Sequence, residues 1–139
     1  MKDRPRKSHM VIGVVSCLFI LFIGTTLSTE LLESYGEGAG WFIQSFDIYY
    51  KLGSSTLFLV LDLIFSGIIV IFSGYIAALI ARKNELKTGM VSGVFALIFF
   101  ILVAPYYFYK FPFFYVALTF LIIIFGPVVG AKVRLRQVT

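Results

Sequence analysis

Four long apolar runs divide this chain, and they constrain its fold more than any other feature. They cover approximately residues 10–27, 56–81, 88–104 and 112–131. A helix needs about 20 apolar residues to cross the hydrocarbon core of a bilayer, and each run is near that length. Because 60% of the 139 residues are hydrophobic, few polar residues remain to solvate a separate water-soluble domain. The sequence therefore predicts an all-α polytopic membrane protein with one domain, residues 1–139, and four transmembrane helices in a bundle.

The distribution of basic residues predicts the orientation of these helices. Ten of the twelve Lys and Arg residues precede the first run, separate the second from the third, or follow the fourth. Only Lys51 and Lys110 lie in the two other connections. Since cytoplasmic segments carry an excess of Lys and Arg, both termini are predicted to be cytoplasmic in a multi-pass protein of the cell membrane. The net charge of +5 follows from this pattern, so no nucleic-acid partner is expected.

The first outer connection, residues 28–55, is the only long segment between the predicted spans. Gly36, Gly38 and Gly40 favour a flexible turn in its first half. Its second half contains five aromatic residues at near-helical spacing: Trp41, Phe42, Phe46, Tyr49 and Tyr50. They form either a short interfacial helix in the headgroup region or a loop whose rings anchor the span ends. The second outer connection adds two more interfacial anchors, Tyr106 and Tyr107.

Small residues gather at the predicted cytoplasmic ends of the last three runs. Gly89 precedes Gly93 by four residues, and Gly126 precedes Gly130 by the same spacing. Such pairs let helix backbones approach closely in lipid, where no hydrophobic force drives helices together. Gly74 lies in a similar Gly/Ala-rich stretch of the second run. The helices are therefore expected to converge on the cytoplasmic side.

Asp62 is the residue that bears most directly on function. A charged side chain costs about 2.5–3.5 kcal/mol at the centre of an inserted helix, and it marks either a pathway or a structural contact. Helical periodicity places Asp62, Ser66 and Ser73 on one stripe. This stripe could line a path for a proton, a cation or a small polar solute. We favour the structural hypothesis, in which Asp62 bonds one residue of another segment: Thr25, Tyr115, Thr119 or Lys110.

Residue types needed for catalysis are scarce. His9 is the only histidine and lies in the basic N-terminal segment, whereas Cys17 is the only cysteine and lies in the first run. A nucleophile–histidine pair or a histidine-based metal site therefore cannot be assembled within the spans. The acidic residues of the first outer connection lack the spacing of an EF-hand. We predict a protein that is not an enzyme and holds no cofactor or metal.

Residues 72–98 read FSGYIAALIARKNELKTGMVSGVFALI. They resemble small four-helix bacterial and archaeal integral membrane proteins of unknown function, which share a Gly/Ala-rich helix end, a short basic turn and a glycine-containing third helix, followed by a fourth helix that closes on glycine. The resemblance covers about half the chain, implies the same four-helix topology and supplies no activity. Small multidrug transporters differ because they carry a membrane glutamate in their first helix. Fluoride channels differ because their dual insertion depends on a charge bias near zero.

Three functions are consistent with these features. The first, which we expect, is a non-enzymatic membrane subunit or scaffold that packs against a partner membrane protein or forms a homo-oligomer in the lipid bilayer. The second is a small transporter or channel protomer that uses Asp62 in the stripe with Ser66 and Ser73. The third is a toxin-immunity or membrane-permeabilising accessory protein.

Overall fold

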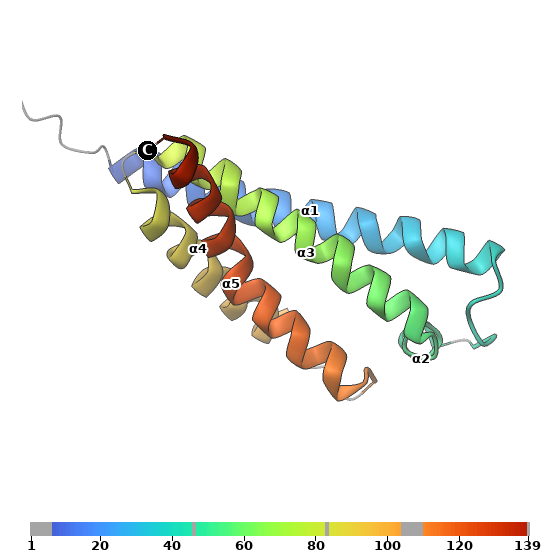
Figure 1. Cartoon of the computed structure of the whole chain (residues 1–139). Coiled ribbons are helices and arrows are strands. Elements are labelled where there is room, and N and C mark those ends of the chain that lie inside the picture. The colour runs from blue at the N-terminus through green and yellow to red at the C-terminus, as the bar shows by residue number, and fades with distance from the viewer. Residues whose placement is uncertain (1–6, 46, 83, 104–109, 139) are drawn as a thin grey trace, which may run out of the picture.

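In the residues that it describes, the computed structural model of the chain has five α-helices, four of which are long and apolar enough to cross a membrane (Figure 1). It describes residues 7–45, 47–82, 84–103 and 110–138. The helices in chain order are α1 (Lys7–Gly38), α2 (Ile48–Gly53), α3 (Thr56–Ala81), α4 (Glu85–Val103) and α5 (Phe113–Val138). No strand occurs within the described ranges, and this confirms the predicted all-α class with four membrane-length helices.

Helix α3 occupies the central position. It packs against α1 on one side and against α5 on the other, and α4 packs mainly against α5 (Figure 1). The start of α1 and the last turns of α5 lie at one end, which we call the terminal end (Figure 1). Helix α2 and the start of α5 lie at the opposite end, which we call the distal end. Helices α1, α3 and α5 lie close together at the terminal end and diverge toward the distal end (Figure 1).

Close backbone contacts hold α3, α4 and α5 together near the terminal end. Four of the five glycines predicted to pack helices lie at such contacts, Gly74, Gly89, Gly93 and Gly130, whereas a Cβ atom on Gly126 would first meet the side chain of Val70. A Cβ atom added to Gly93 would lie 2.6 Å from the carbonyl oxygen of Ile124. Gly130 approaches the backbone of Ile71 still more closely. Any side chain at these positions would push two helices apart, because the atoms that it meets belong to backbone.

The boundaries of α3 follow from its flanking residues. Ser55 precedes the helix in an extended conformation, and its side chain accepts a hydrogen bond from the Phe58 N–H at 3.2 Å. This is the arrangement of an N-cap, which satisfies one free N–H group of the first turn. At the other end Arg82 has a positive φ of 56°, and its N–H donates to the Ala78 carbonyl at 3.1 Å. The helix therefore stops where the sequence changes from small apolar residues to a basic turn.

Helix α1 continues well past the apolar run and ends in a glycine turn. This turn differs from the flexible one expected at Gly36, Gly38 and Gly40. Gly36 and Gly38 are helical, and only Gly40 has a positive φ, of 71°. The Gly40 N–H donates to the Glu37 carbonyl (3.2 Å), and the Trp41 N–H donates to that of Gly36 (2.9 Å). This pair of bonds forms a Schellman motif, in which glycine takes the left-handed position because it has no Cβ. The three glycines therefore do not form one flexible turn.

The short helix α2 covers only the last part of the aromatic half of this connection. Trp41 and Phe42 precede it and lie outside any helix. The Trp41 ring packs edge-on against Tyr35 of α1, with centroids 5.4 Å apart, and Phe42 packs against Phe58 of α3 at 5.2 Å. Among the predicted anchors, Tyr49 and Tyr50 belong to α2, whereas three lie outside the described residues: Phe46, Tyr106 and Tyr107. The described rings thus fasten the connection to α1 and α3.

Candidate functional site: a cavity at Asp62

Asp62 joins three helices near the distal end. It lies close to the start of α3 and is only 4% exposed. The Thr29 hydroxyl on α1 donates to Oδ1 at 2.7 Å, and the Tyr115 hydroxyl on α5 donates to Oδ2 at 2.6 Å. Hydrogen bonds of this kind hold transmembrane helices in register, because an unpaired carboxylate would be costly there.

Of the four partners that the sequence suggested for Asp62, only one binds it in the structure. Tyr115 is one of the four candidates, whereas Thr29 was missed because the first apolar run ends two residues before it. Thr25 and Thr119 instead donate to carbonyl groups of their own helices, at 2.6 and 2.8 Å. Lys110 forms an ion pair elsewhere. Thr29 could have been found by continuing the first helix, with its 3.6-residue period, beyond the end of the apolar run.

No basic side chain pairs with Asp62 in the part of the chain that the structure describes. Its two partners are neutral hydroxyl groups, each bound to a different carboxylate oxygen. An ionised carboxylate offers about four lone-pair positions. Asp62 therefore keeps acceptor capacity that these partners do not use.

Asp62 lies on the wall of a cavity of about 380 Å³. Residues of α1, α3, α4 and α5 form most of this wall, with Leu52 of α2 and Phe111 at the distal end. Among the described residues, six aromatic rings line it: Phe22, Phe58, Phe99, Phe100, Phe111 and Tyr115. Glu30 is the second acidic residue of the wall, and no described Lys, Arg or His belongs to it. The cavity thus combines a mostly apolar surface with two carboxylates.

The polar stripe predicted along α3 is interrupted below this cavity. Ser66 lines the cavity with Asp62, but Ser73 is fully buried beyond it and pairs with Cys17 of α1, with Oγ and Sγ 3.3 Å apart. Val70 lies between the two serines on α3 and is 1% exposed. A Cβ added to Gly126 would lie 2.5 Å from Val70 Cγ1, so the closely packed α5 backbone holds this side chain in place. Cys17 and Ser73 therefore form a separate buried contact.

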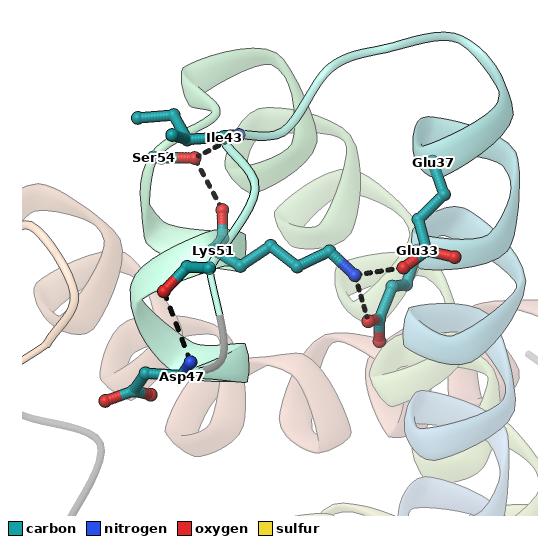
Figure 2. A network of polar contacts seen from close by, with 7 residues as sticks. Glu33, Glu37, Ile43, Asp47, Lys51 and Ser54 are labelled. Atoms are coloured by element: carbon teal, nitrogen blue, oxygen red, sulfur yellow. Dashed lines mark hydrogen bonds and ion pairs between the residues drawn. The ribbon is translucent and has the colours of Figure 1, made fainter.

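Three ion pairs between described residues tie the connections together at the distal end, and Figure 2 shows the two that Lys51 forms. Lys51 extends from α2 to Glu33 on α1, with Nζ 3.2 Å from Oε1, and it also pairs with Glu37 (Figure 2). The hydrogen bond with Glu37 is the main cause that raises the pKa of Lys51 above its ordinary value. Lys110 pairs in turn with Asp47 in the segment before α2. Since the next residue after Lys51 is Leu52 of the cavity wall, these pairs hold α2 against the cavity.

We expect the substitution Lys51→Glu to loosen α2, because a third carboxylate would then face Glu33 and Glu37. Hydrogen–deuterium exchange of the amides in residues 48–53 should become several-fold faster in low salt. High salt should reduce the difference between variant and wild type, since exposed charges are screened. Reversing all three charges, with Glu33→Lys and Glu37→Lys added, should restore slow exchange. Equal exchange rates in Lys51→Glu and wild type would contradict this role.

Comparisons of the chain with protein-family models, with curated proteins and with solved structures found no match. Within the described residues, no group of three or more His, Cys, Asp and Glu side chains could hold a metal ion. The cavity and the groups that line it are therefore the features that bear on function.

Proposed function

We propose that the protein is a small, non-enzymatic transporter protomer that binds its solute in the cavity at Asp62. One observation carries the proposal: a buried carboxylate without a basic partner among the described residues lines a cavity between four membrane-length helices. Small-molecule sites have volumes of about 300–1,000 Å³, a range that includes this cavity. Ionisable residues within membrane spans often mark the path of a solute or ion.

The shape of the cavity favours a carrier over an open channel. Val70 closes its floor, and the glycine contacts bring α3, α4 and α5 together beyond that point. The hydroxyl groups of Ser66 and Ser73 therefore do not form a continuous polar path through the protein. A carrier exposes its central site to one side of the membrane at a time, so a half-open cavity fits one state of such a cycle.

In this proposal the four long helices form one bundle in the cell membrane. The terminal end faces the cytoplasm, because ten of the twelve basic residues precede the first apolar run, separate the second from the third or follow the fourth in the sequence. The cavity consequently opens outward, and α2 lies in the outer headgroup region with Trp41 and Phe42 beside it. Substrate would enter from outside and leave after the packed half near Val70 separates.

A scaffold function has less support from the contacts within the chain. That hypothesis expects the packed half of the bundle, together with the aromatic outer face, to dock a partner or a second copy. In the packed half Gly93 faces Ile124 and Gly130 faces Ile71, so these small-residue surfaces are occupied within the chain. Exposed apolar side chains of the long helices are what lipid covers in any membrane protein, and they do not favour a protein partner.

Cysteine labelling tests whether water reaches the cavity from outside. In a Cys17→Ser background, Ser66→Cys should react with a membrane-impermeant cationic thiol reagent added to intact cells, because only a hydrated thiol reacts readily. Ile68→Cys is the matched control, since it lies on the same helix at similar depth and Ile68 is 60% exposed toward the surrounding lipid. We expect no labelling of Ile68→Cys, and none of Ser73→Cys beyond the floor.

Failure of Ser66→Cys to react from either side of the membrane would contradict the transporter proposal. That result would mean that lipid fills the cavity and that solute has no aqueous access to Asp62. Reaction from the cytoplasmic side alone would reverse the proposed orientation.

A further inference from the structure

We infer that the cavity at Asp62 binds an amphipathic organic cation: a compact ammonium group beside the carboxylate, with an apolar or aromatic body against the rings. The inference rests on the proposed function and specifies its substrate class. The charge of the cavity wall, its excess of hydrogen-bond acceptors and its aromatic residues each favour a ligand of this class.

The charge of the wall favours a cation. Glu30 and Asp62 are its only charged residues among those described. The two basic residues nearest in sequence to the distal end of the wall are Lys51 and Lys110, and both pair with carboxylates that do not line the cavity. Apolar surroundings lower the effective dielectric constant, so an uncompensated carboxylate attracts a cation and repels an anion more strongly than it would in water.

Five of the six hydroxyl groups that described residues place on the wall, all but that of Ser66, also favour a ligand that donates or carries positive charge. Thr29 and Tyr115 commit their protons to Asp62. Thr25, Thr26 and Thr119 commit theirs to backbone carbonyls of their own helices, at 2.6, 2.8 and 2.8 Å. A hydroxyl group that donates its single proton can offer a ligand only its lone pairs. These five groups therefore present acceptors to the cavity, as the two carboxylates do.

The apolar part of the wall fits the body of such a ligand. Phe22 and Phe99 meet edge to face with ring centroids 4.9 Å apart, and together they close the side between α1 and α4. Aromatic rings attract cations through their faces and pack against apolar groups. A volume of about 380 Å³ accommodates a molecule of the size of benzyltrimethylammonium. A lipid acyl chain would also fit an apolar wall, but it would leave the acceptor groups and both carboxylates without a partner.

Binding to the purified full chain in mild detergent tests the inference. Isothermal titration should give saturable binding of benzyltrimethylammonium that is at least tenfold tighter than binding of phenylmethanesulfonate, an anion of similar size. Asp62→Asn should weaken cation binding at least tenfold, and Glu30→Gln several-fold. Glu85→Gln makes the same chemical change at the start of α4, at the terminal end, and should leave binding unchanged. Glu30 is exposed, so its variant tests the inference even if Asp62→Asn fails to fold.

The outcomes separate this inference from the transporter proposal. Equal binding of the cation and the anion, or cation binding unchanged in both Asp62→Asn and Glu30→Gln, would overturn the inference while labelling of Ser66→Cys still supported a carrier. A lipid retained in native mass spectrometry, together with no cation binding, would also overturn it and identify the occupant as an acyl chain. Tight cation binding without uptake into vesicles would support the inference and contradict transport.

Discussion

Asp62→Asn should abolish the accumulation of benzyltrimethylammonium by liposomes that contain the protein, and it should leave the fold intact. With a potential that is negative inside, wild-type vesicles are expected to accumulate the cation, and vesicles with the variant should fall to the level of protein-free liposomes. An interaction with a charged group contributes about 1.5–3 kcal/mol, which corresponds to roughly a ten- to hundredfold change in affinity. Loss of the carboxylate charge removes that contribution from the ligand.

The fold should survive because asparagine has nearly the same shape as aspartate. Its carbonyl oxygen can accept from one of the two hydroxyl groups, and its amide can donate to the other, since a hydroxyl can also accept. The connection between α1, α3 and α5 through Thr29 and Tyr115 would thus persist with one bond reversed. A thermal unfolding midpoint close to that of wild type, measured in detergent, provides the control.

The companion variants Thr29→Val and Tyr115→Phe distinguish a binding role from a structural one. Each removes a donor and keeps the charge of Asp62. They should lower the unfolding midpoint, because a buried carboxylate loses a partner, and they should retain the preference for a cation over an anion. Normal cation uptake by Asp62→Asn, together with reduced stability, would instead assign Asp62 to helix register alone.

Hydropathy predicted which segments are helices more reliably than it predicted where they end. The second run, residues 56–81, coincides with α3, because a serine cap and a positive-φ arginine bound it directly. Helix α1 continues to Gly38 and α5 continues to Val138, beyond the apolar runs at both places. Hydropathy records contact with lipid, whereas polar and charged residues such as Glu and Arg continue a helix readily in water.

The same difference explains which parts of the site were predictable. The cost of burying a charge marked Asp62, and helical periodicity placed Ser66 beside it on the cavity wall. Thr29 lies in the polar extension of α1, so a helix that stops at the end of the apolar run excludes it. Periodicity also joined Ser73 to the stripe, but it could not reveal that Val70 separates the two serines. A helical wheel shows on which face of a helix a residue lies, but it does not show which side chains of other helices pack against that face.

Gly130→Leu should prevent α3 and α5 from packing and should leave little folded protein. Gly130 lies so close to the backbone of Ile71 and Tyr75 that even a Cβ atom would require the helices to separate. Overpacking a closely fitted contact costs about 1–3 kcal/mol, and here no flexible side chain can move aside, so we expect the upper end of that range or more. Folded yield and elution in gel filtration after detergent extraction would measure the loss.

A graded pair of variants tests whether that loss comes from the contact itself. Gly130→Ala adds a single methyl group at the contact and should lower the unfolding midpoint clearly. Gly67→Ala adds the same group on α3, where the nearest atom is the tip of Ile122 at 3.9 Å, and it should be neutral. If Gly130 served a partner or a second copy instead, Gly130→Leu would keep its wild-type unfolding midpoint while the mass of the purified particle fell. That result would restore the scaffold hypothesis, because the small-residue surface would then be needed between chains and not within one.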